Sequence, residues 1–302
     1  MRWSDCLSRQ LCVTSGVRQG GILSPILFNV YVNCMISSLR SLGLGCYFHG
    51  MFLGCIMYAD DLLLISASVR DLQSMLDCCN SIGDSLNIKF NVAKSKCIVI
   101  GSKILSSDLA SMIIDNRSLS WVDNIKYLGV TLLSGNYFKV DLSDVRRKFF
   151  VSVNIILSKC SYVSEPAKLK LMETHCLPIL LYAIESMNFN PALLKDINTW
   201  WNSVYRKIFK FNKWESVKCL ICLLGRFDIY HLENVRRIKF LKNMSGVQSL
   251  NSVVSFVNSK YVNRGEFWSM INKFNMDFNW SYGKIKAMSH ISFQNIAVDS
   301  SV

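Results

Sequence analysis

The segment that most constrains this chain is residues 56–65, IMYADDLLLI, in which two adjacent carboxylates separate two short apolar runs. Each run has the length of a buried strand, so the pattern predicts a β-hairpin with Ala59, Asp60 and Asp61 at or near its tip. A sheet interior excludes unpaired charges, so the tip must face water, a cation or a basic partner. A bridging divalent cation would remove the repulsion between the carboxylates, but this segment alone favours a solvated acidic turn over a metal site.

The length and composition predict a globular protein with two domains. A chain of 302 residues, 51% of them hydrophobic, can build two cores and is not disordered. No uninterrupted apolar run reaches the roughly 18 residues of a membrane span, and residues 1–5 lack the apolar core of a signal peptide. We therefore expect an intracellular protein, cytoplasmic or nuclear, with no membrane partner.

The positive charge is unevenly distributed along the chain. The net charge is +13; residues 1–138 carry 11 basic and 9 acidic residues, a net of +2, which leaves +11 for residues 139–302. This asymmetry suggests that the first part performs chemistry and the second holds a polyanion. A basic surface that serves only solubility is the alternative, and charge alone does not exclude it.

The twelve cysteines are typical of a reducing compartment, because most of them lie inside apolar runs. Cys219 and Cys222 have the spacing of a zinc knuckle, with His231 as the only nearby further ligand. A structural zinc site usually needs four ligands. The sequence therefore favours buried core cysteines at these two positions over a zinc site.

A glycine-rich loop precedes the first predicted helix. Residues 14–21, TSGVRQGG, are followed by Ser24, a suitable helix cap, and by apolar residues at helical spacing as far as position 42. The loop places Arg18, Gln19 and the amides around Gly20 near a helix N-terminus, where a phosphate or a nucleotide can bind. Glycine-rich turns before helices are common, so this signal is weak alone.

The rest of the first part has a mixed pattern. A helix capped by Ser68 follows the hairpin, and residues 88–101 predict a polar turn leading into a strand. Strand pairs are expected around residues 115–117 and at 125–133. We therefore predict an α+β domain over residues 1–138, in which helices pack on an antiparallel sheet.

The pattern becomes helical from about residue 139. Four helices are expected, starting near residue 142, after Ser164, at Asn190 and near residue 228. We assign residues 139–245 to a helical domain and leave residues 246–302 as an unassigned C-terminal tail. Tryptophans interleaved with lysines could stack on single-stranded nucleic acid, although one of Trp200 and Trp201 is expected in the core.

Four motifs give this chain a resemblance to the reverse transcriptases of non-LTR (LINE-type) retrotransposons. Residues 15–28, SGVRQGGILSPILF, are similar to the nucleotide-pocket B motif, and residues 58–61, YADD, to the catalytic C motif. Residues 91–95, NVAKS, resemble the D motif, and residues 126–130, KYLGV, the E motif or primer grip. Their order and spacing both match the family, and the first motif is long, so a chance agreement of all four is very improbable.

The resemblance implies an RNA-directed DNA polymerase that performs two-metal nucleotidyl transfer with Mg²⁺. The fold would be α+β, with a partial polymerase palm followed by an all-α thumb-like domain. The implied partners are an RNA template, a DNA primer and a dNTP, with no other small-molecule cofactor. The implied residues are Asp60 and Asp61 as catalytic metal ligands, Lys94 at the leaving pyrophosphate, Arg18, Gln19 and Gly20 at the nucleotide, Tyr127, Leu128 and Gly129 at the primer end, and Arg146, Arg147, Lys148, Arg206 and Lys207 along the nucleic-acid backbone. For Lys94, an exposed turn lysine without a catalytic role is nearly as good an interpretation.

The sequence departs from the family pattern before the B motif. The family's A motif carries a third carboxylate well upstream, whereas only 15 residues precede Gly16 here, and Asp5 is their sole acid. We therefore expect a C-terminal palm-plus-thumb portion, truncated before the B motif, with an unpaired apolar edge on the 55–66 hairpin and no polymerase activity by itself. Two alternatives remain: a catalytically silent nucleic-acid-binding protein, and a truncated element copy without function.

Overall fold

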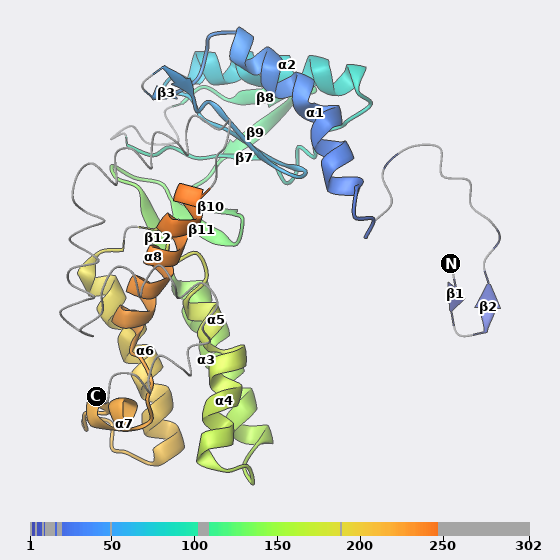
Figure 1. Ribbon diagram of the computed structural model, residues 1–302. Helices are drawn as coiled ribbons and strands as arrows, with labels where there is room; N and C mark the ends of the chain where they lie inside the picture. The colour runs from blue at the N-terminus through green and yellow to red at the C-terminus, as the bar shows by residue number, and fades with distance from the viewer. Residues whose placement is uncertain are drawn as a thin grey trace. The chain divides into compact units, whose positions relative to one another are not determined.

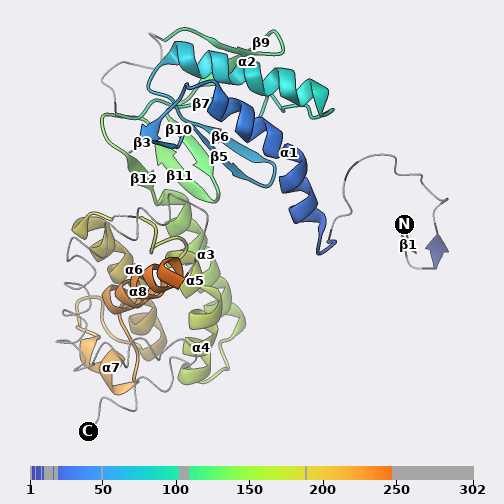
Figure 2. The same ribbon diagram turned by 45° about the horizontal axis from the view of Figure 1, so that its top comes forward.

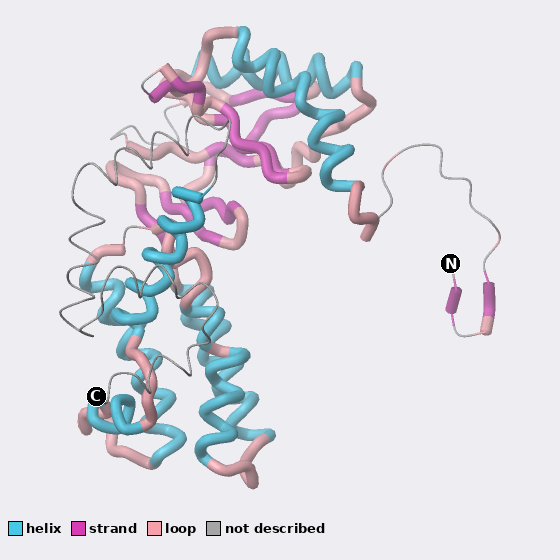
Figure 3. The backbone as a smooth tube through the Cα atoms, in the orientation of Figure 1, coloured by secondary structure: helices cyan, strands magenta, loops and turns pink. Residues whose placement is uncertain are grey.

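The computed structural model describes residues 2–3, 5–7, 9, 16, 20–48, 50–101, 109–187 and 189–246. The chain divides into two compact units, Met1–Lys139 and Val140–Val302. The first combines helices with small sheets and the second is helical, which makes the chain an α+β protein (Figures 1 and 3). Within the described residues, no helix is both long enough and apolar enough to cross a membrane.

The first unit contains two long helices and a series of short strands. Its helices are α1 (Ser24–Ser41) and α2 (Val69–Ser85). Its strands are β1 (Arg2–Trp3), β2 (Cys6–Leu7), β3 (Tyr47–Phe48), β4 (Met51–Phe52), β5 (Cys55–Tyr58), β6 (Asp61–Leu64), β7 (Lys96–Cys97), β8 (Met112–Ile114), β9 (Arg117–Trp121), β10 (Asn124–Tyr127) and β11 (Val130–Leu133), and β12 (Lys139–Asp141) begins at the last residue of this unit.

These strands form several small sheets instead of the one antiparallel sheet that the pattern predicts. Three are two-stranded (β1-β2, β3-β4 and β5-β6), and two are three-stranded, in the orders β7-β9-β8 and β10-β11-β12. The expected strand pairs around 115–117 and at 125–133 are confirmed as the antiparallel pairs β8-β9 and β10-β11. The prediction is wrong for β7 and β9, which pair in parallel with Lys96 opposite Ser120. Local patterns detect hairpins but not pairs whose strands are far apart in the chain.

The core of the first unit lies where α1 packs on α2, which also packs on β8 (Figures 1 and 2). Met35 and Leu39 of α1 meet Met75 and Cys79 of α2, and all four are buried. The predicted cap of α2 is confirmed, because the Ser68 side chain accepts a hydrogen bond from the backbone N–H of the first turn. At α1 the prediction is wrong: Leu23 occupies the N-cap position and Ser24 is the first helical residue.

Helix α1 does not bury all the apolar residues whose spacing predicts it. Its buried residues are Val32, Met35 and Leu39. Leu27 and Val30, which contribute to the predictive spacing, are exposed, and Val30 is 70% accessible. Spacing at helical period detects a helix, but it does not decide which part of a wide apolar surface is covered.

The second unit is built from six described helices. They are α3 (Ser143–Lys159), α4 (Glu165–His175), α5 (Leu177–Leu180), α6 (Pro191–Phe209), α7 (Lys218–Leu223) and α8 (Ile229–Gly246). The predicted starts of α4 after Ser164 and of α6 at Asn190 are confirmed, and the Asn190 side chain caps α6 by accepting from the Ala192 N–H at 3.0 Å. The remaining tail, residues 247–302, lies outside the described residues.

An aromatic group occupies the core of the second unit. Trp201 of α6 is 1% accessible, and its ring is perpendicular to that of Tyr205 at 5.7 Å and lies 6.5 Å from Phe149 of α3. Such edge-on pairs add to the stabilisation that burial provides. The expectation that one of the two adjacent tryptophans is a core residue is confirmed, since Trp200 is only partly buried.

The interpretation of Cys219 and Cys222 as core residues is wrong. Both thiols are exposed on the short helix α7. The third candidate ligand, His231, is instead engaged with Asp228 at 2.7 Å. Across the part of the chain that the structure describes, no three His, Cys, Asp or Glu residues gather as a metal site would require.

Candidate active site

The acidic segment forms the predicted hairpin in the first unit. Strands β5 and β6 pair antiparallel, and Tyr58 lies opposite Asp61 in the last pair of the ladder. Ala59 and Asp60 form the turn, and Ala59 adopts a left-handed backbone with φ of +51°. A non-glycine residue pays a steric cost there, and such strain often accompanies functional turns. Both carboxylates are therefore held at the tip.

The base of this hairpin is anchored while its tip is free. Cys55, Leu62 and Leu64 are partly buried and pack against the core of α1 and α2. Asp60 and Asp61 are exposed. The apolar base fixes the strands by burial, and the charged tip keeps its hydration. In the described part of the chain β5 and β6 form a sheet of their own, without a third strand.

The donor atoms at the tip fit part of a magnesium site. Mg²⁺ prefers oxygen ligands, keeps several waters, and is usually held by one or two carboxylates together with substrate phosphates. Asp60 and Asp61 supply carboxylates on adjacent residues at an exposed position. Among the described residues they are not joined by a third His, Cys, Asp or Glu.

Strands β10 and β11 form a second hairpin in the first unit. In β10-β11, Tyr127 lies opposite Val130, so Leu128 and Gly129 form a tight two-residue turn. Both have positive φ, +44° and +83°, which glycine adopts readily and leucine rarely. Tyr127 is the last residue of β10, directly before this turn.

Tyr127 connects the two hairpins electrostatically. Burial raises the pKa of the Tyr127 hydroxyl, and the negative charge of Asp61 raises it further. The hydroxyl oxygen is buried and has no hydrogen-bond partner among the described residues. A buried hydroxyl without a partner is costly, and such groups often serve a ligand. The structure therefore brings Asp61 and Tyr127, which are 66 positions apart in the sequence, into one electrostatic environment.

Lys94 lies on an exposed turn before β7. Asn91 organises this turn: its backbone oxygen accepts from the N–H of Lys94 and of Ser95, each at 3.0 Å, and its side chain accepts from Lys94 N–H at 3.2 Å. These hydrogen bonds hold the backbone of the turn at Lys94. The role at the leaving group stays a prediction.

The glycine-rich loop is only partly described. Arg18 and Gln19 lie outside the described residues. Gly20 has φ of +78°, and an added Cβ would meet no atom within 4 Å. Backbone conformation, not crowding, is thus what favours glycine at this position.

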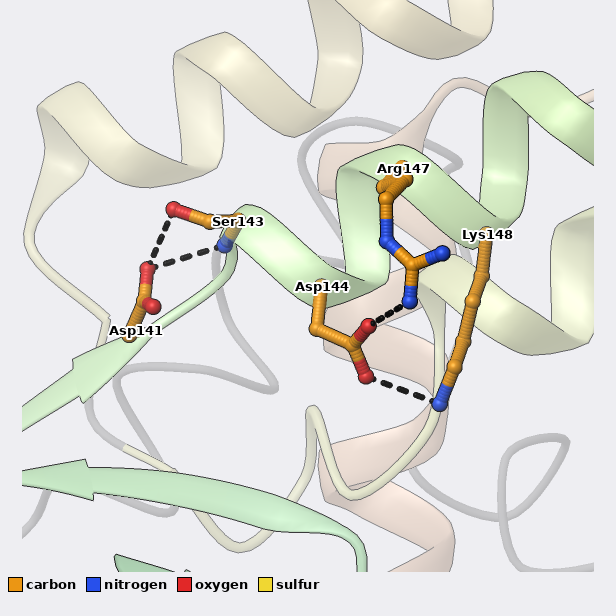
Figure 4. Close-up of polar contacts among 5 residues, drawn as sticks. All are labelled: Asp141, Ser143, Asp144, Arg147 and Lys148. Carbon is orange, nitrogen blue, oxygen red and sulfur yellow. Dashed lines mark hydrogen bonds and ion pairs between the residues drawn. The ribbon is translucent and has the colours of Figure 1, made fainter. Parts of the chain in front are cut away.

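Arg147 and Lys148, two of the five predicted nucleic-acid-binding residues, share one acid at the start of α3 (Figure 4). Asp144 accepts from Arg147 at 2.6 Å and pairs with Lys148 at 2.8 Å. Asp141, two residues before the start of α3, accepts hydrogen bonds from the Ser143 backbone N–H at 2.9 Å and from the Ser143 hydroxyl at 2.6 Å. Asp144 offsets part of the positive charge here.

Arg146 and Lys207 lie along a shared face of α3 and α6, which we call the α3–α6 seam. The Arg146 guanidinium is 5.6 Å from the ring centre of Trp200, and the Lys207 ammonium is 5.6 Å from that of Phe150. Lys207 also donates to Asn154 at 3.3 Å. Cation–π contacts of this kind hold long basic side chains in place without neutralising them.

Arg206 has a different role from its neighbour. Its Nε donates to the backbone oxygen of Glu215 at 2.9 Å, which fixes the turn after α6. Sequence reasoning missed the aromatic partners of the seam, Phe150 and Trp200. No local spacing could have found them, because each cation lies on a different helix from the ring that it contacts.

Comparison with known proteins links the first part of the chain to a family. Residues 2–132 match the family described as "Reverse transcriptase (RNA-dependent DNA polymerase)". The matched residues include both the acidic hairpin and the Tyr127 hairpin. Residues 2–132 are therefore a reverse transcriptase domain.

The relatives in this family are proteins of non-LTR retrotransposons. The chain is 27% identical over 216 residues to the "Retrovirus-related Pol polyprotein from type-1 retrotransposable element R2" of Popillia japonica, covering 68% of this chain and 34% of the relative. It is 26% identical over 189 residues to the "RNA-directed DNA polymerase from mobile element jockey" of Drosophila funebris, covering 60% of this chain and 20% of the relative. The resemblance to this group is confirmed, and the chain spans about a third or less of each relative.

Proposed function

We propose that the first unit is part of the palm, and the second unit part of the thumb, of an RNA-directed DNA polymerase. The observation that carries the proposal is the convergence of Asp61 and Tyr127 within a domain that matches the reverse transcriptase family. The acidic tip supplies the negative charge that metal-assisted phosphoryl transfer requires. The second hairpin supplies Tyr127, whose pKa is affected by Asp61. The substrates would be a dNTP and a DNA primer paired to an RNA template.

In this proposal each hairpin has a defined task. Asp60 and Asp61 hold Mg²⁺, which when bound lowers the pKa of the primer 3′-hydroxyl and offsets charge on the leaving pyrophosphate. The turn of Leu128 and Gly129, together with Tyr127, places the primer end. Lys94 contacts the pyrophosphate. Arg18, Gln19 and Gly20 bind the nucleotide near the start of α1.

The basic residues of the α3–α6 seam bind the nucleic acid in this proposal. Arg146 and Lys207 are exposed, and aromatic rings support both of them. They would contact backbone phosphates, which position a duplex without reading its sequence. Arg147 and Lys148 would attract backbone phosphates less strongly, because both pair with Asp144.

Recognition of the correct nucleotide tests the proposal. A primed RNA template is bound to the chain with Mg²⁺, and each dNTP is added in turn while retention of the primer is measured. We expect only the dNTP complementary to the templating base to stabilise the complex, and Asp61→Asn to abolish the effect. Equal behaviour of all four dNTPs would contradict the assignment.

We further propose that residues 1–302 alone do not extend a primer. Asp60 and Asp61 provide two carboxylates, and no third acid joins them within the described residues. Loss of one charge contact to the transition state typically costs about 3 kcal/mol, or roughly a hundredfold in rate. Extension is measured beside Asp60→Ala, and incorporation above this control would refute the proposal.

A non-catalytic nucleic-acid-binding protein is the second candidate. The observation that favours it is the same absence of a third acid near the tip in the described residues, combined with the basic residues of the second unit. It predicts binding that persists in Asp60→Ala, shows no dependence on the added dNTP, and weakens when Arg146 and Lys207 are neutralised.

A further inference from the structure

The turn that follows α6, residues 210–216, is a rigidly built part of the surface. Lys210 ends the helix in a left-handed conformation with φ of +57°, and the Phe211 N–H donates to the Arg206 backbone oxygen at 3.0 Å. This is a common way to terminate a helix. The chain therefore leaves α6 in a fixed direction.

Glu215 stabilises this turn through hydrogen bonds to Asn212 of the turn and to Arg206. Its carboxylate accepts from the Asn212 backbone N–H at 2.7 Å and from the Asn212 side chain at 2.9 Å. These hydrogen bonds lower the pKa of Glu215, and the one from the Asn212 side chain has the larger effect. The backbone oxygen of Glu215 also accepts from Arg206 at 2.9 Å. The only acid of the turn is thus occupied internally.

Trp214 projects from this fixed turn into solvent. It is 87% accessible, and the Lys213 ammonium lies 5.1 Å from its ring centre. Phe211, in the same turn, is 37% accessible. Tryptophan is usually well buried, so an exposed indole on an ordered turn is an unusual feature of a protein surface.

The surroundings of Trp214 are strongly basic. Residues 206–218 contain five Lys or Arg residues and one acid, Glu215. Lys210, Lys213 and Lys218 are all exposed. An accessible aromatic ring among exposed cations is the combination that binds single-stranded nucleic acid, because bases stack on the ring while the cations neutralise phosphates.

We propose that the 210–216 turn is a binding site for single-stranded nucleic acid, with Trp214 stacking on an unpaired base and Lys213 contacting the adjoining phosphate. A duplex does not offer this contact, since its bases are already stacked on one another. The site differs from the α3–α6 seam in exposure, because the seam rings Phe150 and Trp200 are partly buried whereas Trp214 is 87% accessible. It does not depend on polymerase activity.

The test compares an unstructured oligonucleotide with a duplex of the same length. Binding to the full chain is measured by fluorescence anisotropy for wild type, Trp214→Ala and Trp214→Phe. Loss of one stacked base costs about 1–3 kcal/mol, so Trp214→Ala should weaken oligo(U) binding roughly 5- to 150-fold. Trp214→Phe should retain most of the affinity, and duplex affinity should stay within about twofold of wild type, because a duplex makes no stacking contact with Trp214.

Two matched variants sharpen the comparison. Tyr162 is a fully exposed aromatic residue elsewhere in the same unit, and Tyr162→Ala should leave oligo(U) binding unchanged. Lys213→Gln should reduce the slope of log affinity against log salt by about 0.7, as expected for one phosphate contact on a single strand. Thermal unfolding of each variant shows that the fold is retained.

Three outcomes would overturn the proposal. The first is unchanged oligo(U) affinity in Trp214→Ala. The second is an equal loss for oligo(U) and duplex, which would make the turn part of a general basic surface. The third is tighter binding of an acidic peptide than of oligo(U), which would assign the turn to a protein partner.

Discussion

At the scale of single residues, the Tyr127 hydroxyl should contribute nothing to stability. It is buried without a partner among the described residues, so Tyr127→Phe removes a desolvated group and loses no hydrogen bond within them. We expect the free energy of unfolding to stay unchanged or to rise by up to about 1 kcal/mol. Urea titration measures it.

Tyr31 provides the control for this prediction. Its hydroxyl donates to the Leu86 backbone oxygen at 2.7 Å, so Tyr31→Phe should lose about 1 kcal/mol. A Tyr127→Phe variant that is destabilised as much as Tyr31→Phe would contradict the assignment. If the hydroxyl serves the primer, Tyr127→Phe should also bind a primed template more weakly than wild type.

The buried thiols predict how stability changes at alkaline pH. Burial raises the pKa of Cys79 to about 12, with smaller contributions from Cys55 and Cys78, and burial raises that of Cys97 to about 11. An unfolded cysteine titrates near 8.5, so the folded chain holds more protons between that pH and about 11–12. The stabilisation of the folded state by these protonated, buried thiols is complete below about pH 8.5. It is lost as the pH rises above that value.

Denaturant titrations across this range measure the effect. Cys79→Ala should show a shallower decline in unfolding free energy between about pH 8.5 and 10 than wild type. The exposed thiol Cys219 is the control, since Cys219→Ala should leave the decline unchanged. Equal slopes for wild type and Cys79→Ala would contradict the burial assigned to Cys79.

At the scale of elements, the start of α8 depends on an ionised acid. Asp228 accepts from the His231 N–H at 3.0 Å and from its ring at 2.7 Å. Burial alone would raise the pKa of Asp228, but the hydrogen bonds from His231 outweigh it and lower the pKa. The resulting stability is present above the ordinary carboxyl pKa of about 3.9 and is lost as the pH falls below it.

Substitution of Asp228 tests how much this residue stabilises the start of α8. Asp228→Ala should cost about 1 kcal/mol at neutral pH, as expected for a lost cap. Asp228→Asn keeps a side-chain acceptor and should cost less, and its difference from wild type should shrink as the pH falls and Asp228 is protonated. Circular dichroism during urea unfolding follows both, and a difference that persists in acid would contradict the account.

The sequence predicts the structural features that neighbouring residues determine. The hairpin with Asp60 at its tip follows from apolar runs a few residues long, and the caps Ser68 and Asn190 follow from the residues beside them. The parallel pairing of β7 with β9 and the exposure of Cys219 depend on residues distant in the chain. No local pattern carries that information.

The same limit applies to the candidate site. The four motifs identified Asp61 and Tyr127 separately, but the electrostatic effect of Asp61 on Tyr127 depends on the tertiary structure. The aromatic support of Arg146 likewise requires a second helix, and the rigidity of the turn that carries Trp214 requires its hydrogen bonds. Motif resemblance can name residues of a site, whereas their contacts come from tertiary structure.

At the scale of the whole molecule, the chain joins an acidic tip on one unit to basic surfaces on the other. Residues 139–302 carry a net charge of +11, against +2 for residues 1–138. Such a division suits a polymerase, in which a polyanion is held while its end meets a metal site. In the proposed function, Asp60 and Asp61 bind the divalent cation of this site.

Mn²⁺ binding, followed by electron paramagnetic resonance, tests this claim most directly. Mn²⁺ accepts the same oxygen ligands as Mg²⁺. In the presence of a primed RNA template and the complementary dNTP, wild type should bind Mn²⁺ more tightly than Asp60→Asn and Asp61→Asn, while Asp84→Asn, a substitution at the exposed end of α2, should match wild type. Identical Mn²⁺ binding by all four proteins would contradict the account.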